Sequence, residues 1–376
     1  MKNNSKKLTK VLIASGGTGG HLFPGIALAE AIEKIHPEAK VAFVGTARGL
    51  EAKLIPQTKW SLFLMKTSSF KDQRGLKRLL VFLTMPMALF QALRILLKVR
   101  PSMVLGVGGY AAGPITLMAA FMLIPTAIVE PNATPGLTNK ILGYFVRKVF
   151  VAFPEVLAQF SAKKAVLSGN PVRAKLNNSN ISITKSDQFT VLCFGGSQGA
   201  RRINNAVTSC LDSLGSYKKQ IRFIHQVGRA ENADLIREKY QTAGINAEVC
   251  SFIDDMSSAY AQADIIICRA GATSVAEIIA LGKPAILVPY PHAADDHQRA
   301  NADAVVKKGG AILMLDAAFN GDRLAAEIRS FMQEPWRLEK MSAALQKIYK
   351  PNAANEIVRI CWEMINKKSE PVAHSF

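Results

Sequence analysis

The chain has 376 residues, of which 49% are hydrophobic and 20% charged, with 47 Lys and Arg against 28 Asp and Glu. So many apolar residues exclude an intrinsically disordered protein, and the length predicts two domains with sizeable cores. The five cysteines have no CxxC or CxxxC spacing, which excludes a disulfide framework and a cysteine zinc site and fits a reducing compartment.

The positive charge is concentrated in the N-terminal half of the chain. Residues 1–173 contain 23 basic and 7 acidic residues, whereas residues 174–376 contain 24 and 21. This excess predicts an anionic partner, which could be a nucleic acid, an anionic membrane or a phosphorylated substrate. A solvated basic surface without a partner would have the same composition.

None of the apolar stretches predicts a signal peptide or a transmembrane helix. The run Val11–Ala14 is shorter than the apolar core of a signal peptide, about 7–15 residues. The stretch Leu79–Leu93 contains Pro86 and is shorter than the ~20 residues of a spanning helix. Glycines and prolines divide the stretch Pro101–Val129, which predicts a strand, a glycine loop, a buried helix and a second strand. We therefore expect neither secretion nor a membrane span.

Short apolar strands alternate with helical patterns along the first half of the chain. The strand Lys10–Ala14 leads into a glycine-rich loop at Gly16–His21, and a helix is predicted from Pro24 to Ile35. This βαβ order predicts a parallel sheet covered by helices. The further strands are predicted at Val41–Val44, Val104–Val107, Thr126–Val129 and Val149–Val151.

The same order begins again after a polar linker at Asn177–Gln188. The strand Thr190–Phe194 leads into a second glycine loop, Gly195–Gly199. An α/β fold of two doubly wound domains, each opening with a glycine loop, explains this better than one long sheet. We place the domains at 1–173 and 174–350. We expect the helical tail at 351–376 to return to the N-terminal domain, although its spacing alone does not decide this. The later strands are predicted at Ile221–Ile224, Glu248–Ser251, Ile265–Cys268 and Ala285–Val288.

Three glycine-rich loops, Gly16–His21, Gly106–Gly113 and Gly195–Gly199, indicate a protein that handles diphosphates. A glycine turn lets the backbone approach an anion, and the next helix directs its N–H groups and positive dipole end at it. One such loop could be a tight turn, but two of these occupy matching places. No loop has the GxxxxGK[ST] pattern, and Leu22 replaces the third glycine of a dinucleotide motif, which disfavours a P-loop NTPase and a dehydrogenase.

Two segments after later strands predict further ligand contacts. Ala272–Ser274 could begin a helix that binds a phosphate, and Glu277 follows about one turn later. The Glu277 carboxylate could bind ribose hydroxyls or complement the helix dipole, and its position favours neither. The segment Pro291–Gln298 follows the next strand, at the edge where doubly wound sheets bind ligands, although an ordinary polar loop would look the same.

The residue pattern predicts no metal cofactor, because the chain contains no Asp-x-Asp pair to hold one. Backbone dipoles, hydroxyls and basic side chains would then stabilise the charge of a leaving diphosphate. His21 lies near the start of a helix and fits either a structural histidine or a general base.

Eight segments together resemble the MurG family of bacterial N-acetylglucosaminyltransferases. The resemblance runs in order from about Val11 to Tyr349. The segments are GGTGGHLFPGIALAEAI (16–32), GVGGYAAGP (106–114), EPNATPGLTNK (130–140), GNPVR (169–173), GGSQGARRIN (195–204), FIDDM (252–256), CRAGATSVAE (268–277) and PHAADDHQRANA (291–302).

The resemblance implies a GT-B fold in which two Rossmann-like domains face a cleft. It implies a hexosyltransferase that moves GlcNAc from UDP-GlcNAc, bound by the C-terminal domain, to lipid I, bound by the N-terminal domain. The acceptor group would be the MurNAc 4-hydroxyl of undecaprenyl-pyrophosphoryl-MurNAc-pentapeptide, and the products lipid II and UDP. The implied donor contacts are Thr18, Gly19, Gly20, Asn132, Arg173, Ser197, Ile253, Ala272, Thr273, Ser274, Val275, Ala276, Glu277 and Gln298.

The remaining site residues follow from the same resemblance. Gly17, Gly109 and Tyr110 are expected at the acceptor diphosphate, and we take His21 as the hypothetical base of an inverting displacement. His297 stands where some relatives have the first of two glutamines, so its role stays open.

The segment Lys71–Leu83 mixes basic and apolar residues and predicts a membrane contact. It fits a core helix with a charged rim or an interfacial helix, and the basic excess favours the interfacial one. Because the implied acceptor carries a polyprenyl tail, we expect a peripheral protein at the cytoplasmic face of the bacterial cell membrane. The expected membrane patch is Arg74, Lys77, Arg78, Leu79, Leu80, Phe82 and Leu83.

The expected partners are UDP-GlcNAc, lipid I, an anionic membrane surface and proteins of cell-wall synthesis and division, with no nucleic acid. Two alternatives remain. One is another GT-B member, a glycolipid synthase or a UDP-sugar epimerase. The other is a basic nucleic-acid-binding protein, for which no motif is apparent.

Overall fold

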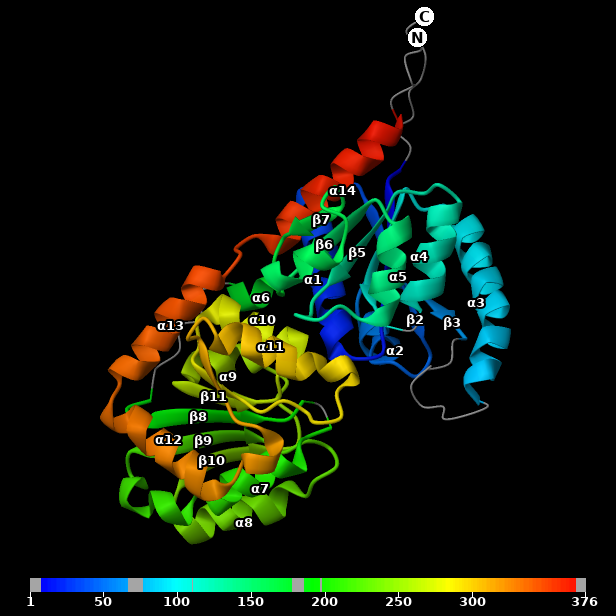
Figure 1. The fold of residues 1–376 in the computed structure, drawn as a ribbon. Helices are drawn as coiled ribbons and strands as arrows, with labels where there is room; N and C mark the ends of the chain where they lie inside the picture. The colour runs from blue at the N-terminus through cyan, green and yellow to red at the C-terminus, as the bar shows by residue number, and fades with distance from the viewer. Residues whose placement is uncertain (1–7, 67–76, 110, 178–185, 197, 370–376) are drawn as a thin grey trace, which may run out of the picture. The chain divides into compact units, whose positions relative to one another are not determined.

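A computed structural model describes residues 8–66, 77–109, 111–177, 186–196 and 198–369, without the side chains of 77–84, 175, 177, 368 and 369. The chain divides into an N-terminal unit, Met1–Arg173 with Lys350–Phe376, and a C-terminal unit, Ala174–Tyr349. Figure 1 shows the ribbon of both units, and each is described below by itself.

The N-terminal unit alternates strands and helices, as its sequence predicts. Its elements are β1 (Lys10–Ser15), α1 (Gly19–Ile35), β2 (Lys40–Thr46), α2 (Glu51–Leu54), η1 (Ile55–Gln57), β3 (Ser61–Met65), α3 (Lys77–Val99), β4 (Met103–Gly108), α4 (Ala112–Phe121), β5 (Thr126–Glu130), α5 (Leu137–Phe145), β6 (Lys148–Val151), η2 (Pro154–Gln159), β7 (Ala165–Leu167) and α14 (Ala353–Ser369). The strands form one parallel sheet in the order β3-β2-β1-β4-β5-β6-β7. The order reverses at β1 and β4, which makes the sheet doubly wound.

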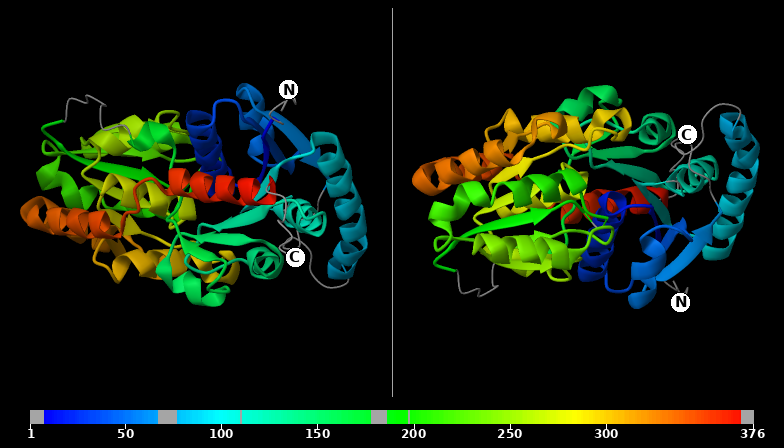
Figure 2. Two further views of the ribbon diagram at one scale, coloured as in Figure 1. Left: turned by 90° about the horizontal axis from the view of Figure 1, so that it is seen from above. Right: turned by 90° about the horizontal axis from the view of Figure 1, so that it is seen from below.

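Alternate residues of each strand pack on opposite faces of this sheet. Val11 and Ile13 of β1 belong to the core that α1 and α14 cover, whereas Leu12 and Ala14 pack with α3 and α4. The blue α1 and the red α14 lie next to each other in Figures 1 and 2. A period of two residues, with both faces apolar, is typical of a strand buried between two helical layers.

The first helix begins earlier than its sequence predicts. α1 begins at Gly19, so the predicted start at Pro24 is wrong. Proline commonly opens a helix, but Pro24 is the sixth residue of α1, where it cannot donate a backbone hydrogen bond. Gly19 and Gly20, the last two glycines of the loop, therefore lie in the first turn of α1, and His21 is the third helical residue.

The C-terminal unit repeats the same plan. Its elements are α6 (Ala174–Asn177), β8 (Phe189–Phe194), α7 (Arg201–Ser209), η3 (Asp212–Tyr217), β9 (Ile221–Gln226), α8 (Ala233–Ala243), β10 (Asn246–Cys250), α9 (Met256–Gln262), β11 (Ile265–Cys268), α10 (Ala272–Leu281), β12 (Ala285–Leu287), η4 (Ala294–Asp296), α11 (His297–Val306), β13 (Ala311–Leu313), η5 (Asp316–Ala318), α12 (Gly321–Gln333) and α13 (Trp336–Ile348). The strands form a parallel sheet in the order β10-β9-β8-β11-β12-β13. The prediction of two doubly wound, Rossmann-like α/β domains is confirmed.

The second long uncharged stretch of the sequence is also divided as predicted. It contains β4, the glycine loop, α4 and β5 in turn. Among the described residues, no helix combines the length and the apolar character that crossing a bilayer requires.

A buried polar network ties two helices of the C-terminal unit to β9. The His225 ring lies fully buried, with Nδ1 3.0 Å from the Tyr240 hydroxyl of α8 and Nε2 3.1 Å from Asn204 Oδ1 of α7. The amide of Asn204 donates to the Val227 carbonyl at 2.9 Å. Burial lowers the pKa of His225 to about 3, so the folded protein holds this ring neutral.

The lowered pKa predicts how His225 affects acid stability. An unfolded histidine binds a proton near pH 6.5 while the folded ring does not, so stability is lost as the pH falls from 6.5 towards 3. Between pH 7 and pH 4 this loss amounts to about 3 kcal/mol of unfolding free energy. We expect His225→Gln to be less stable at pH 7 but to lose less stability on acidification.

Hydrogen exchange of peptides from β8 and β9, corrected for intrinsic rates, measures this difference in the C-terminal unit. An equal loss of protection in both proteins between pH 7 and pH 4 would contradict the neutral, buried histidine.

Candidate functional site

The first glycine loop places backbone amides at the start of a long helix. Gly17 has a positive φ of 88°, and the extended Thr18 is the N-cap of α1. The Thr18 carbonyl accepts from the amides of His21 and Leu22, at 3.2 and 3.1 Å. No acidic side chain lies in the first turn of α1, so its positive dipole end can attract an anion near Gly19 and Gly20.

The first glycine loop, Gly16–His21, packs directly on the third glycine loop, Gly106–Gly113, of the same unit. β1 and β4 are parallel neighbours, with Ser15 paired to Gly108. A Cβ on Gly109 would lie 2.2 Å from the Gly16 carbonyl oxygen, and one on Gly108 would lie 2.4 Å from the His21 ring. Only glycine permits this approach, since real Cβ atoms do not come so near.

These contacts place Gly109 against Gly16, the neighbour of Gly17, and His21 against Gly108, the neighbour of Gly109. The amide of Gly17, however, donates to Glu51 Oε2 at 2.8 Å, so its contact with an acceptor diphosphate stays a prediction. Tyr110, the third residue expected there, lies outside the described residues.

Asn132 is held at the end of the neighbouring strand β5 by a buried carboxylate. Glu130 is 1% exposed and accepts from the Asn132 backbone amide and side chain, both at 3.1 Å. It also accepts from the Gly136 amide at 3.1 Å and the Asn139 side chain at 2.8 Å. Burial raises the pKa of Glu130 above its ordinary value, although these hydrogen bonds oppose the rise.

Arg173 lies over the first helix of its own unit. Its guanidinium carbon is 4.4 Å from the centre of the Phe23 ring, within the range of a cation–π interaction. The Phe23 ring in turn packs against Gly19, where a Cβ would lie 2.9 Å from it. Arg173 is thereby placed near the amide-rich start of α1.

The second glycine loop repeats this arrangement in the C-terminal unit. Gly196 and Gly199 have positive φ angles of 86° and 82°. A Cβ on Gly199 would lie 2.1 Å from the Val227 carbonyl oxygen. Ser197, a predicted donor contact, lies outside the described residues.

Gln226 joins this loop to the predicted donor residue Ile253. The Gln226 side chain is 3% exposed; its Nε2 donates to the Gly196 carbonyl at 3.0 Å, and its Oε1 accepts from the Ile253 amide at 2.9 Å. The sequence did not indicate Gln226, because no local pattern predicts that the last residue of a strand hydrogen-bonds to two loops.

The segment 272–277 forms the first part of α10. Helix α10 begins at Ala272 after the extended N-cap Gly271, and no acid lies in its first turn. Glu277 is the sixth helical residue, beyond the turn where the dipole acts, so the alternative of a dipole-complementing acid does not fit. Its carboxylate is 5% exposed and accepts from the Tyr260 hydroxyl at 2.9 Å. The side chain of Val275 is fully buried, which leaves only its backbone for a ligand.

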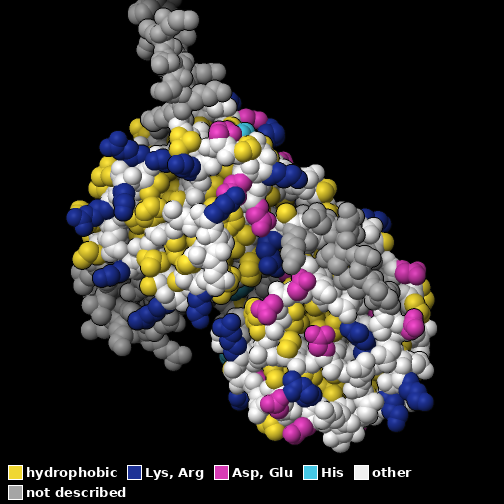
Figure 3. All heavy atoms as spheres, turned by 180° about the vertical axis from the view of Figure 1, so that it is seen from behind, with side chains coloured by type: hydrophobic (Ala, Val, Ile, Leu, Met, Phe, Trp, Pro, Cys, Tyr) yellow, Lys and Arg dark blue, Asp and Glu magenta, His cyan; other side chains and the backbone are white. Residues whose placement is uncertain are grey.

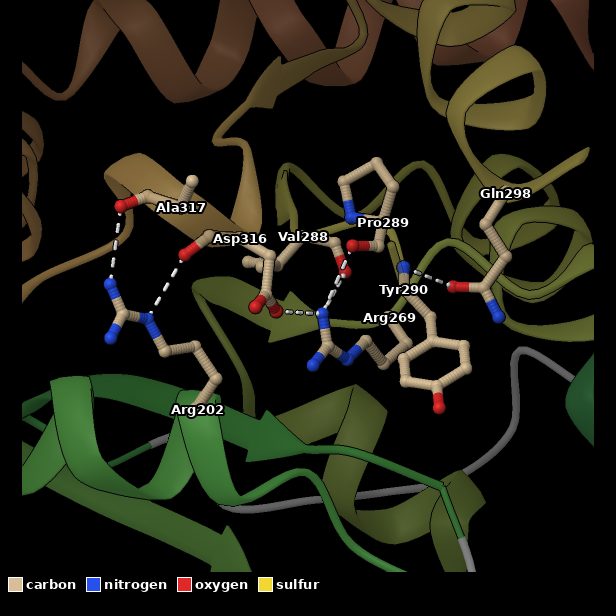
Figure 4. A network of polar contacts seen from close by, with 8 residues as sticks. All are labelled: Arg202, Arg269, Val288, Pro289, Tyr290, Gln298, Asp316 and Ala317. Carbon is tan, nitrogen blue, oxygen red and sulfur yellow. Dashed lines mark hydrogen bonds and ion pairs between the residues drawn. The ribbon is translucent and has the colours of Figure 1, made fainter. Parts of the chain in front are cut away.

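A network of polar contacts surrounds the ends of β11 and β12, as Figure 4 shows. Arg269 donates to the carbonyls of Val288 and Pro289, at 3.1 and 3.0 Å, and pairs with Asp316. Gln298, the second residue of α11, accepts from the Tyr290 amide at 2.9 Å through its Oε1.

The loop before α11 has an unusual backbone. Asp295 and Asp296 both have positive φ angles, 50° and 48°, which non-glycine residues rarely adopt. The His297 ring lies 2.7 Å, at Nδ1, from the Ala294 carbonyl, so it stabilises this turn. This local contact gives His297 a structural role, which its sequence position left open.

The predicted membrane patch is described only in part. Arg74 lies outside the described residues. Lys77, Arg78, Leu79, Leu80, Phe82 and Leu83 lie in α3, where the structure describes their backbone but not their side chains.

Comparison with known proteins agrees with this architecture. Residues 11–151 match the glycosyltransferase family 28 N-terminal domain, and residues 190–357 match the glycosyltransferase family 28 C-terminal domain. The crystal structure of MurG from Acinetobacter baumannii has a TM-score of 0.76 at 28% sequence identity, and the match covers 94% of this chain and 99% of that one.

Two relatives are similar along almost their whole length. A protein of Myxococcus xanthus (strain DK1622) is 46% identical over 359 residues, which are 95% of this chain and 94% of the relative. A protein of Syntrophus aciditrophicus (strain SB) is 44% identical over 357 residues, 95% and 99% of the two chains. Both are named UDP-N-acetylglucosamine--N-acetylmuramyl-(pentapeptide) pyrophosphoryl-undecaprenol N-acetylglucosamine transferase. The chain therefore belongs to glycosyltransferase family 28 and, within it, to the MurG family.

Proposed function

We propose that this chain transfers GlcNAc from UDP-GlcNAc to the MurNAc 4-hydroxyl of undecaprenyl-pyrophosphoryl-MurNAc-pentapeptide, releasing UDP. The observation that carries the proposal is the 46% identity, over 95% of this chain, to a relative named for this transfer. The two doubly wound units, each with a glycine loop before a helix, support it because such loops bind diphosphates.

In this proposal the C-terminal unit binds the donor. Amides at the start of α10 would bind phosphate oxygens, and the Glu277 carboxylate would accept hydrogen bonds from ribose hydroxyls. The Tyr260 hydroxyl donates to one Glu277 oxygen at 2.9 Å and thereby orients the carboxylate. Gln298 would contact the sugar hydroxyls with its side-chain amide.

The N-terminal unit would bind the acceptor and start the reaction. His21 would remove the proton of the acceptor hydroxyl, which attacks the anomeric carbon and inverts its configuration. Negative charge would grow on the UDP diphosphate as the bond breaks, and helix N-termini would stabilise it. His21 suits this role because its ring is fixed against Gly108, at the edge where the first and third glycine loops meet.

We also propose that the N-terminal unit contacts the membrane through a hydrophobic and basic face on α4 and α5. This apolar–basic face consists of Phe121, Leu123, Leu137, Ile141, Tyr144, Phe145 and Lys140, of which Tyr144 is 82% and Leu137 68% exposed. Phe121 and Phe145 pack edge to face, with ring centres 5.7 Å apart. Large apolar side chains exposed together usually mark a binding surface.

The charge around this face supports an anionic partner. Lys164 donates to the Tyr144 carbonyl at 2.7 Å, and α4 packs on α3, which opens with the basic residues Lys77 and Arg78. Figure 3, seen from behind relative to Figure 1, shows that basic side chains also lie among hydrophobic ones on another side of the N-terminal unit. We expect a peripheral protein on the cytoplasmic face of the bacterial membrane, near proteins of cell-wall synthesis and division.

The function is tested by measuring UDP release with and without a lipid I analogue. We expect release to require the analogue and to be reduced about 10²–10⁴-fold in His21→Ala, because the base is lost. Release without an acceptor would indicate an epimerase or hydrolase instead. Near-normal turnover of a folded His21→Ala protein would remove His21 as the base without affecting the transfer itself.

Glu277→Ala is expected to raise the KM for UDP-GlcNAc about 10–100-fold with a smaller effect on kcat, because hydrogen bonds to a carboxylate are lost. Tyr260→Phe is the matched control, since it removes the internal hydrogen bond but keeps the carboxylate. An equal rise of the donor KM in both variants would assign Glu277 a purely structural role.

Leu137→Glu combined with Tyr144→Glu should weaken binding to vesicles that contain anionic lipid by about tenfold or more, since two apolar side chains no longer enter the bilayer. Leu235→Glu with Leu315→Glu changes two exposed apolar residues of the C-terminal unit and serves as the control. Sedimentation with vesicles measures the binding, and equal binding of both double variants would refute this surface.

A further inference from the structure

Glu51 is a carboxylate buried between two loops of the N-terminal unit. It is the first residue of α2 and is 0% exposed. Its Oε2 accepts from the Gly17 amide at 2.8 Å, while its Oε1 accepts from the Thr46 amide at 2.7 Å and the Thr46 hydroxyl at 3.0 Å. One side chain therefore joins the loop after β1 to the end of β2.

Three glycines surround the Glu51 side chain so closely that a side chain on any of them would displace it. A Cβ would lie 2.2 Å from the Glu51 side chain at Gly16, 2.3 Å at Gly45 and 2.1 Å at Gly49. Gly45 and Gly49 lie within six residues of Glu51, but Gly16 follows β1, so the cage is complete only in the folded unit. Its tightness fixes the carboxylate, and with it the amide that the carboxylate holds.

The cage is continuous with the predicted site. Gly16 touches Glu51 on one side, and its carbonyl touches Gly109 on the other. Gly108, the neighbour of Gly109, supports the His21 ring. A shift of the Glu51 carboxylate would therefore move the first glycine loop, the third loop and the ring of His21.

Both oxygens of Glu51 are needed as acceptors. In Glu51→Gln the side-chain NH₂ group would face a backbone N–H, either that of Gly17 or that of Thr46. Two donors cannot satisfy each other, and a buried donor without an acceptor is costly. The glutamine would keep the shape of Glu51, but one of the two backbone amides, that of Gly17 or that of Thr46, would lose its acceptor.

We infer that Glu51 is a positioning residue for the transfer reaction: it holds the Gly16–His21 loop in the conformation that presents the helix amides and His21 to the acceptor. The role of Glu51 in the reaction rests on the proposed function, whereas its role in the loop conformation does not. Glu51 itself touches no substrate in this role, because its carboxylate is enclosed by the cage.

The experiment compares Glu51→Gln and Gly49→Ala with the parent. Gly49→Ala keeps the carboxylate but places a methyl group where it lies, so both changes should have the same effect. We expect kcat/KM for a lipid I analogue to fall about 100-fold in each, as for a misplaced catalytic group. The affinity for UDP-GlcNAc, measured by calorimetry, should fall much less than kcat/KM, because most of the implied donor contacts lie in the C-terminal unit. The double variant should be no worse than either single one, because both act on one contact.

Glu33→Gln is the matched control. Glu33 lies in the same unit and accepts from the Trp60 indole at 2.8 Å, away from the glycine loops. It should keep the parent's kcat/KM. Parental turnover in a folded Glu51→Gln protein would overturn the inference, and so would an equal loss of donor affinity and turnover, which indicates general damage. If Glu51→Gln does not fold, the kcat/KM and the donor affinity of Gly49→Ala test the inference in the same way.

Hydrogen exchange separates this inference from the proposed function. Peptides covering 15–22 should exchange faster in Glu51→Gln than in the parent, while peptides from β5 and β6 should not change. This readout needs no turnover. A parent that transfers no GlcNAc would refute the proposed function alone, whereas unchanged exchange of 15–22 would refute the inference alone.

Discussion

Each of the two units depends on a contact between two backbone segments at a glycine loop. The segments lie closer together than any side chain would permit. In the N-terminal unit Gly109 lies against the Gly16 carbonyl, and in the C-terminal unit Gly199 lies against the Val227 carbonyl. Both glycines have φ angles near +85°, where other residues are strained. Each contact joins the end of the first strand of the unit to a loop beside it, so the loop is fixed before any ligand binds.

A buried polar side chain completes the support of each loop. Glu51 accepts from the Gly17 amide, and Gln226 donates to the Gly196 carbonyl while it accepts from the Ile253 amide. Burying such groups is unfavourable unless they are hydrogen-bonded, so a loop that moves leaves polar atoms without partners. This penalty favours one loop conformation. The two units thus use the same device with different residues, an acid in one and an amide in the other.

The sequence predicts the strands and glycine loops because these have local signals. Apolar runs of four to six residues predict β1 and β8, and the clustered glycines that follow predict the loops after them. The start of α1 was missed because Pro24 looks like a first helical residue, whereas the tertiary contacts of the Gly19–Phe23 turn determine it. Glu51 was missed for a related reason. Its contact with the Gly17 amide joins positions 34 residues apart, and an acid between apolar residues looks like any surface carboxylate.

The loop supports also affect the charge of the N-terminal unit. Of the seven acidic residues in 1–173, Glu51 and Glu130 are buried, and their oxygens accept mainly from backbone and amide groups of loops. Residues 1–173 then keep five other acidic residues against 23 basic ones, and residues 350–376 of the same unit add three acidic and four basic ones. The same carboxylates that organise the amides therefore leave few negative charges at the surface. Since exposed charges act over about 10 Å at moderate salt, a diphosphate or an anionic lipid surface near this unit would meet mainly positive charge.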